Sequence, residues 1–391
     1  MSEKNIKKIL GNTFMDIANA IETGSFGSKV KVGITTLGSE HGIDNLVKGA
    51  ELANRDAADF EIVLIGPKVE TELEVVEVNT EADMHKKMEE LLESGYISAC
   101  VTMHYSFPIG VSTVGRVITP AVGQEMFIAT TTGTSATNRS EAMVKNALYG
   151  IVAAKAMGYK NPTVGILNVD NARGVERALR ELNDNGYEIN FGESKRADGG
   201  SVMRGNDLLM GSVDVMVTDT LTGNIMMKMF SSYATGGSYE ASGYGYGPGI
   251  GIDYDKAILI LSRASGVPVV ANAIKYAASL AKGNLIDVAN AEFKKAKAAG
   301  LDAVLKSFHK EAAVATEEVT APPKEVVTSD ISGIDIMDLD AACEALWKES
   351  IYAESGMGCT GPIVLVNEKN LEKAIVILGK AGYVASQKPD C

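Results

Sequence analysis

The chain has 391 residues, of which 46% are hydrophobic, and it carries a formal net charge of −13 at pH 7. A chain of this length and apolar content can bury a large core and favours roughly two or three domains. The acidic balance excludes nucleic acid and anionic membrane as the main partners, because both require a basic surface.

Neither the N-terminus nor the cysteines and histidines indicate export or metal binding. The first 14 residues contain lysines but no apolar core of the secretory type, and no apolar run approaches membrane-spanning length. A cytoplasmic location is therefore expected. The four cysteines form no Cys-x-x-Cys pair, and the four histidines show no metal-ligand spacing. We expect reduced thiols, no bound metal and no cofactor, since dinucleotide and P-loop signatures are also missing from the sequence.

Apolar runs typical of strands alternate with runs of helical period along most of the chain, after an N-terminal helix within residues 1–25. Strands are predicted at Val30–Thr35, Glu61–Ile65, Ala99–Met103, Met126–Thr130, Thr163–Val169, Val213–Asp219 and Val267–Val270. Helices are predicted at Ile43–Arg55, Ala82–Glu93, Ser140–Met157, Gly174–Asn185, Gly223–Tyr233, Ala271–Ala281 and Ala291–Ala315. This order predicts an α/β fold, three-layer and doubly wound, with a mainly parallel sheet spanning residues 26–314.

A linker and a small second unit follow the large domain. Residues 315–329 are predicted to form the linker, because Pro322 and Pro323 cannot continue a helix. When extended at roughly 3.1 Å per residue, this linker spans on the order of 45 Å. Residues 330–391 are predicted to form a small α/β module, with a helix, a glycine-rich turn, a strand and a second helix.

The turn of this module carries Cys359, within a run of three glycines and a proline from Gly356 to Pro362. These residues remove the bulk that would shield the sulfur and favour a tight turn. Cys359 is therefore a candidate nucleophile, although a small structural residue in a turn is the alternative. The module contains no histidine, so its thiolate must be favoured by backbone N–H groups or by groups from the larger domain or a partner.

Four polar loops follow predicted strands, where helix N-termini present free N–H groups to anions. The first loop covers residues 37–42 and contains His41, and the second covers residues 131–139 and contains Thr134, Ser135 and Arg139. The third covers residues 219–224 with Asp219, Gly223 and Asn224, and Lys228 follows it one helical turn later. The fourth covers residues 261–266 and contains Ser262 and Arg263. Ordinary helix capping is the alternative explanation for each loop. The glycine-rich stretch 236–251 is predicted to be a mobile lid or a plain flexible loop.

Several segments of residues 30–281 resemble the phosphate acyltransferases of phospholipid synthesis. The similar segments are Gly38–Gly42, Glu61–Gly66, Asn161–Asn168 and Val217–Lys228. Glu40 and Ile43 replace the usual acid and proline of the first motif. Gly247-Pro248 and Leu261-Ser262-Arg263 are more distantly similar to phosphotransacetylases. The resemblance implies the fold shared by phosphate acyltransferases and isopropylmalate dehydrogenase.

Those acyltransferases lack a linked thiol module like residues 330–391 of this chain. A chain that combines such a domain with a cysteine-bearing module resembles the component C alpha-subunit family of the glycine/sarcosine/betaine reductase complex. The resemblance implies that the chain takes a carboxymethyl group from selenoprotein A, forms an acetyl thioester on Cys359 and releases acetyl phosphate by phosphorolysis. It also implies a hetero-oligomer with a beta subunit, and inorganic phosphate as a reactant.

This chemistry gives each candidate residue a role. Cys359 is expected to be the nucleophile, with His41 and Asp219 in orientation or proton transfer. The expected phosphate-binding and oxyanion-stabilising residues are Thr134, Ser135, Arg139, Gly223, Asn224, Lys228, Ser262 and Arg263. Two alternatives stay open: a free-standing phosphate acyltransferase that uses coenzyme A or acyl carrier protein, and a non-catalytic scaffold subunit.

Overall fold

The structure is a computed structural model that describes residues 29–55, 57, 59–196, 199–309, 319–334, 338–358 and 361–384, with isolated positions before residue 22. For residues 357, 358, 361 and 362 only the backbone is described. The predicted N-terminal helix lies almost wholly outside the described residues, and Cys359 and the first part of the linker lie outside them too.

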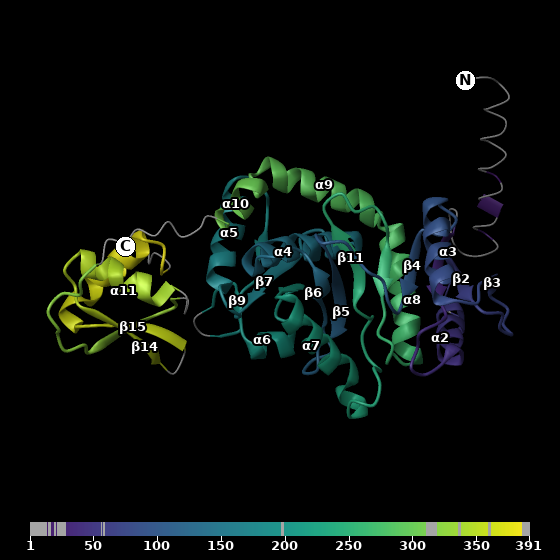
Figure 1. Ribbon diagram of the computed structural model, residues 1–391, viewed down its shortest axis with the longest axis horizontal. Helices are drawn as coiled ribbons and strands as arrows, with labels where there is room; N and C mark the ends of the chain where they lie inside the picture. The colour runs from purple at the N-terminus through teal and green to yellow at the C-terminus, as the bar shows by residue number, and fades with distance from the viewer. Residues whose placement is uncertain are drawn as a thin grey trace, which may run out of the picture.

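Within the described part of the chain, twelve strands form one large sheet in the order β3-β2-β1-β4-β12-β11-β5-β6-β10-β7-β8, with β9 also paired to β7 (Figure 1). The strands are β1 (Val30–Thr35), β2 (Phe60–Gly66), β3 (Glu74–Glu77), β4 (Ala99–Thr102), β5 (Val111–Ile118), β6 (Glu125–Thr134), β7 (Thr163–Leu167), β8 (Asn190–Phe191), β9 (Val202–Met203), β10 (Val215–Val217), β11 (Gly247–Gly251) and β12 (Ile258–Ile260). Most neighbouring pairs are parallel, as predicted.

Helices cover both faces of this sheet. They are α2 (Ile43–Arg55), α3 (Glu81–Glu93), α4 (Arg139–Ala156), α5 (Ala172–Asp184), α6 (Gly205–Met210), α7 (Thr220–Ser232), α8 (Val267–Lys282), α9 (Leu285–Ala298) and α10 (Leu301–Ser307), with the short η1 (Tyr233–Thr235) after α7. Helices α4 and α7 pack on opposite faces of β6.

Side-chain alternation along the strands explains the three layers. In β2, Ile62 and Leu64 join the large core under α2, α4 and α8, whereas Val63 and Ile65 join a second core under α3. In β6, Phe127 and Ala129 likewise face the large core, and Met126 and Ile128 face a third core under α6 and α7. Because successive strand residues point to opposite faces, both faces must be covered. The three-layer α/β prediction is confirmed.

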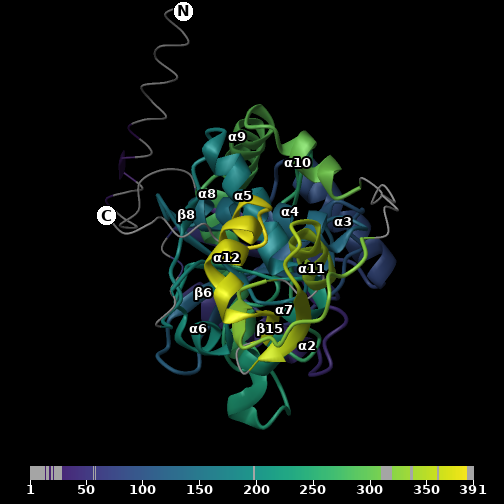
Figure 2. The ribbon, with the colours of Figure 1, turned by 90° about the vertical axis from the view of Figure 1, so that its left-hand side faces the viewer.

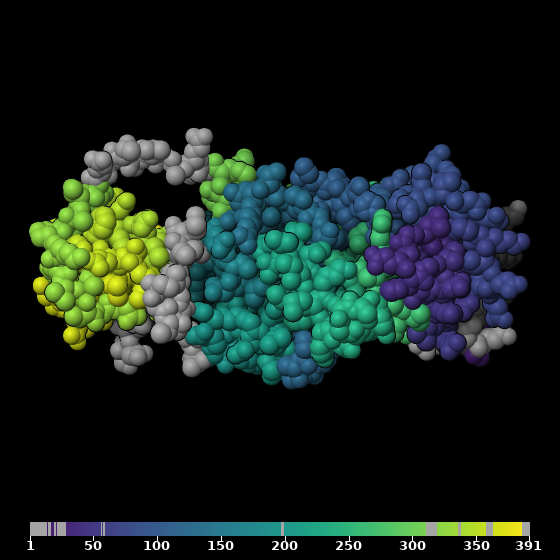
Figure 3. Space-filling view, turned by 60° about the horizontal axis from the view of Figure 1, so that its bottom comes forward, coloured from purple at the N-terminus to yellow at the C-terminus, as the bar shows by residue number. Residues whose placement is uncertain are grey.

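The C-terminal module has its own sheet and core. Strands β13 (Ser329–Ser332), β14 (Ala353–Gly358) and β15 (Gly361–Val366) form an antiparallel sheet in the order β13-β15-β14. Helices α11 (Leu339–Lys348) and α12 (Leu371–Lys380), with η3 (Glu368–Asn370), pack against it around a separate apolar cluster. Figure 3 shows the module as a distinct lobe at one end of the molecule. The limits of the domains stay a prediction.

Three predicted elements differ from the structure. Val267–Val270 begins α8 and is not a strand, because Pro268 is tolerated in a first helical turn and a short apolar run fits either structure. The long predicted helix from Ala291 is divided into α9 and α10 at Gly300, whose φ is +93°. The predicted lid contains β11, which lies buried in the middle of the sheet.

Candidate active site

The reversal of strand direction in the middle of the sheet places a pocket at the centre of the large domain. The pairs β12-β11, β11-β5 and β5-β6 are antiparallel, so β4 and β12 run opposite to β6 and β10. The pocket is lined by residues at and after the carboxyl ends of β4 and β12, and by Thr132, Gly133 and Thr134 at the end of β6. Its volume is about 340 Å³.

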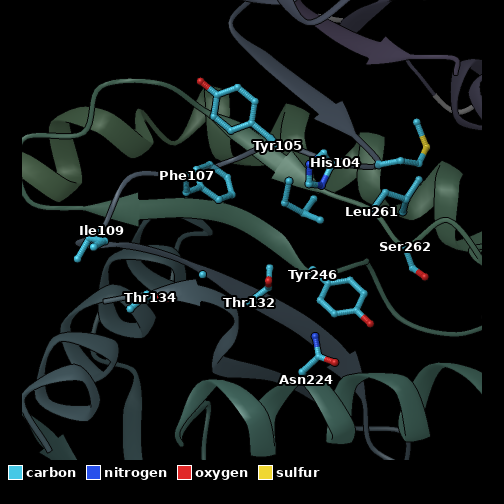
Figure 4. A pocket seen from close by; sticks show the side chains of 13 residues that line it. His104, Tyr105, Phe107, Ile109, Thr132, Thr134, Asn224, Tyr246, Leu261 and Ser262 are labelled. Atoms are coloured by element: carbon cyan, nitrogen blue, oxygen red, sulfur yellow. The ribbon is translucent and has the colours of Figure 1, made fainter. Parts of the chain in front are cut away.

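The two sides of this pocket, which we call the central pocket, differ in chemistry (Figure 4). One side is rich in aromatic and aliphatic groups from the segments after β4 and β12, namely Met103, Tyr105, Phe107, Ile109, Ile260 and Leu261. Across from it stand polar groups of β6 and α7, including Thr132, Thr134 and Asn224. Ser262 lies at one end. The pocket can therefore hold a small molecule with one apolar and one polar part.

Helix α7 brings Asn224 to the pocket through close packing on β6. A Cβ atom at Gly223 would lie 1.8 Å from the carbonyl oxygen of Thr130, so only glycine permits this approach. Asn224 adds a hydrogen bond to this contact between α7 and β6, because its Nδ2 donates to the carbonyl oxygen of Thr131 at 3.0 Å. Gly223 and Asn224, predicted where a polar loop meets the start of a helix, lie within α7, which begins three residues earlier than predicted, at Thr220.

Lys228 and Ser262 meet beside the pocket. Lys228 Nζ donates to Ser262 Oγ at 2.6 Å and to Glu240 Oε1 at 2.7 Å. The Glu240 side chain is only 1% exposed, whereas that of Lys228 is 46% exposed. This arrangement places one ammonium group, partly open to solvent, next to a hydroxyl that lines the pocket, which suits an anionic ligand.

Arg139 and Asp219 form a separate cluster. Arg139 donates to Asp219 Oδ2 at 2.9 Å and to Asp170 Oδ2 at 2.7 Å, so two carboxylates already balance its charge. Asp219 caps α7 by accepting from the backbone N–H and hydroxyl of Thr222. Burial raises the pKa of Asp219, but the bonds from Thr222 and Arg139 outweigh it and lower the pKa overall. Neither residue lines the central pocket.

Ser135, Arg263 and His41 also lie outside the pocket lining. Ser135 is buried, and its hydroxyl is bonded to Ser112 Oγ at 2.6 Å and to Asn146 Oδ1. Arg263 is exposed, and its carbonyl oxygen accepts from the backbone N–H of Glu40. His41 lines a second cavity of about 540 Å³ with Tyr239, Gly266 and other residues. Of the predicted phosphate-binding residues, Thr134, Asn224 and Ser262 line the central pocket, and Lys228 contacts its edge.

Comparison with known proteins gives the family. A family model described as "Fatty acid synthesis protein" matches residues 30–365. The glycine/sarcosine/betaine reductase complex component C subunit alpha of Peptoclostridium acidaminophilum is 72% identical over 383 residues, covering 97% of this chain and 100% of that protein. The chain belongs to the component C alpha-subunit family. This confirms the resemblance seen in the sequence.

The chain is also similar to more distant proteins. A phosphate acyltransferase of Thermotoga petrophila is 27% identical over 241 residues, covering 53% of this chain and 69% of that protein. The crystal structure of a branched-chain phosphotransacylase from Enterococcus faecalis covers 64% of this chain and 99% of its own, at 17% identity and a TM-score of 0.45. Among the helices that the structure describes, none is long and apolar enough to cross a membrane.

Sequence reasoning missed several residues of the site in this component C family member. Tyr105 and Phe107 form much of the apolar side of the pocket, but they follow β4 in a segment that carries no motif. Tyr246 lies in the glycine-rich stretch 236–251 that the sequence predicted to be a lid or a flexible loop, but it is buried and lines the pocket. Glu240 gave no signal, because a single glutamate in a glycine-rich stretch looks like a solvated loop residue.

The cysteines that the structure describes are unsuited to nucleophilic chemistry. Cys100 and Cys343 are both buried. Burial raises the pKa of Cys100, and burial, helped by nearby carboxylates, raises the pKa of Cys343 to about 11. A thiol with a raised pKa is mostly protonated at neutral pH and reacts slowly. A nucleophilic thiol of this chain is therefore not expected at Cys100 or Cys343.

Proposed function

We propose that this chain is an acyl-transferring subunit that makes acetyl phosphate from an acetyl group held as a thioester on Cys359. The observation that carries the proposal is the central pocket, where the Lys228 ammonium and the Ser262 hydroxyl stand beside a chamber with one apolar side. The apolar side suits the acetyl methyl group, and the polar groups suit phosphate. Family membership supports the same reaction.

The chemical step is a phosphorolysis. A phosphate oxygen attacks the thioester carbonyl carbon, a C–O bond forms, and the C–S bond breaks. The sulfur of Cys359 leaves as a thiolate and takes up the proton that phosphate gives up, so no oxidant or reductant is needed. Fixed donors stabilise the charge on the carbonyl oxygen during attack. Lys228, Ser262 and Asn224 are the proposed donors, whereas Asp219 serves the fold as a helix cap.

The source of the acetyl group and the partners are part of the proposal. Following the family, we propose that the two-carbon unit comes from the carboxymethyl group on selenoprotein A, and that the chain acts in a hetero-oligomer with a beta subunit. The related protein of Peptoclostridium acidaminophilum is described as a subunit of a reductase complex.

The test replaces the proposed nucleophile. We expect Cys359→Ala to lower arsenate-dependent turnover of acetyl phosphate by more than about a thousandfold, as removal of a covalent nucleophile commonly does. Cys391→Ala is the matched control, since it also removes a cysteine near the C-terminus, and it should keep activity. Limited iodoacetamide labelling of the unmodified chain should mark Cys359 before Cys100 and Cys343, both of which are buried.

The main alternative is a free-standing phosphate acyltransferase, which the match to the Thermotoga petrophila enzyme favours. In that case the acyl group arrives on coenzyme A or acyl carrier protein, and Cys359 is dispensable. Full activity of Cys359→Ala with an acyl-coenzyme A substrate would establish this alternative. If neither the unmodified chain nor the Cys359→Ala variant turns over acetyl phosphate, and iodoacetamide labels no cysteine preferentially, the chain is a scaffold subunit.

A further inference from the structure

A buried carboxylate lies behind the polar end of the central pocket. Glu240 is 1% exposed, and it follows η1 in the glycine-rich stretch. Its Oε1 accepts from Lys228 Nζ at 2.7 Å, and its Oε2 accepts from Ser265 Oγ at 2.9 Å. A buried carboxylate is unfavourable unless it is paired. The pairing with Lys228 therefore fixes the ammonium group in one place.

The backbone of Glu240 is bound to the same loop that carries Ser262. Its N–H donates to the carbonyl oxygen of Ala264 at 2.9 Å, and its carbonyl oxygen accepts from the N–H of Gly266 at 2.8 Å. Side chain and backbone thus hold α7 and residues 262–266 together at one point. Glu240 is well placed to set the position of both Lys228 and Ser262.

The hydrogen bonds around Ser262 determine the direction of its own proton. Ser262 Oγ accepts from Lys228 Nζ at 2.6 Å and from the backbone N–H of Ala264 at 3.2 Å. A hydroxyl has two lone pairs and one proton, so both acceptor positions are used and the O–H is left to donate. Because Ser262 lines the central pocket, its O–H is available to an acceptor oxygen of a molecule in the pocket.

We propose that Glu240 is a positioning residue, which holds the Lys228 ammonium against Ser262 so that the Ser262 hydroxyl donates to a phosphate oxygen in the pocket. This inference rests on the proposed function, since it names phosphate as the ligand. Glu240 itself does not touch the ligand. It acts through Lys228, whose remaining N–H and positive charge also face the anion.

The test measures binding of inorganic phosphate to the full chain by isothermal titration calorimetry. We expect Glu240→Gln, which keeps the shape of the side chain and removes its charge, to weaken phosphate binding by about tenfold. Glu240→Asp, which restores the charge, should recover part of the affinity. Lys228→Gln should weaken binding at least as much as Glu240→Gln.

A double variant distinguishes positioning from a general structural effect. If Glu240 acts only through Lys228, the variant carrying both Glu240→Gln and Lys228→Gln should bind phosphate no more weakly than Lys228→Gln alone. Glu292→Gln is the matched control, because Glu292 is also buried and paired with lysines, Lys155 and Lys295, but on α9. It should lower stability and leave phosphate affinity unchanged.

The outcomes separate the two proposals. Unchanged phosphate affinity in Glu240→Gln, or losses that multiply in the double variant, would overturn the role of Glu240 while the proposed function stands. An equal loss of affinity in Glu292→Gln would overturn it as well, since the effect would then follow from stability. If the unmodified chain neither binds phosphate nor turns over acetyl phosphate, the proposed function fails, and this inference fails with it.

Discussion

Single charged residues of the large domain divide into those that serve the fold and those that face the pocket. Asp219 and Arg139 had the sequence signature of an anion site, a polar loop at a helix start. In the structure they bind each other and Asp219 caps α7, whereas Lys228 is held at the pocket by the buried Glu240. The sequence alone could not distinguish charged residues that serve the fold from those that face the pocket, because the distinction depends on which carboxylate lies beside which basic side chain in the folded chain.

A pH-dependent stability follows from Asp219. Its pKa in the folded chain is lowered, below the usual value of about 3.9 in an unfolded chain. The folded state therefore favours the carboxylate. The resulting stabilisation is complete above about pH 5 and is lost as the pH falls through the folded-state pKa.

We expect Asp219→Asn to lower the free energy of unfolding by about 1 kcal/mol at pH 7, because it keeps the cap but loses the charge beside Arg139. The difference from the unmodified chain should shrink as the pH falls below about 4. Urea unfolding at several pH values measures this. Asp170→Asn is the control, since that carboxylate pairs with the same arginine but its side chain is 70% exposed. An equal, pH-independent loss in both variants would contradict the argument.

At the scale of elements, the sequence predicted β1, β2, β4, β6, β7, β10 and most helices, but neither the edge strands β3 and β8 nor the central strands β12, β11 and β5. Strands such as β1 and β2 are continuous apolar runs, and their burial on both faces is readable from composition. Strand β11 is Gly-Pro-Gly-Ile-Gly, a composition typical of a loop. It forms a strand because β5 and β12 supply its hydrogen bonds, which no local pattern reveals.

The glycines of β11 are required by packing. Gly247 has a φ of +81°, and a Cβ atom there would lie 1.8 Å from the carbonyl oxygen of Val114 in β5. We expect Gly247→Ala to lower the free energy of unfolding by about 2–5 kcal/mol, from backbone strain and overpacking together. Gly205→Ala in α6 is the control, since its added Cβ meets no atom within 4 Å. Urea unfolding of both variants provides the test, and equal stability would contradict it.

The pocket could be predicted only in part for the same reason. Asn224, Lys228 and Ser262 were predicted because they follow strands in polar segments. That they come together depends on contacts between segments far apart in the sequence, namely the close packing of Gly223 in α7 on β6 and the bond from Lys228 to Ser262 after β12. The aromatic side of the pocket also depends on β11, because Phe107 packs against Gly249 of that strand.

At the scale of the whole molecule, the C-terminal module lies at one end of the large domain, and Figure 2, seen from that end, shows α11 and α12 of the module in front of it. Arg177 of α5 donates to the carbonyl oxygen of Gly382 at 3.1 Å and to Asp338 Oδ2 at 3.2 Å. A cavity of about 800 Å³ lies between α5 and the module, so the two surfaces fit loosely. This contact between α5 and the module is at the β7–β9 end of the sheet, whereas the central pocket lies between β4 and β6.

A contact of this kind is expected to be weak. The Arg177 side chain is 48% exposed, and exposed ion pairs stabilise by about 1 kcal/mol or less. The module has its own core. At the end of the predicted linker, Thr328 N–H donates to the carbonyl oxygen of Val366, and the carbonyl oxygen of Val326 accepts from Asn367, so these residues are held on the module. Only the earlier part of the linker predicted over residues 315–329 can extend, at roughly 3.1 Å per residue. We therefore propose that the module leaves α5 at little cost in free energy, as delivery of an acetyl group on Cys359 to the central pocket requires.

Charge reversal at the Arg177–Asp338 contact tests whether the module leaves α5 easily. We expect Arg177→Asp, which faces Asp338 with a like charge, to release the module and to raise the radius of gyration measured by small-angle X-ray scattering at low salt. High salt should move the unmodified chain in the same direction, because it screens exposed charges. The double change Arg177→Asp with Asp338→Arg should restore the compact form. Lys256→Asp is the control, since Lys256 pairs with Glu93 of α3 and does not line the cavity beside the module. Scattering that is identical in all four proteins would show that the module is held by other contacts, and delivery to the pocket would then need a partner subunit to dislodge it.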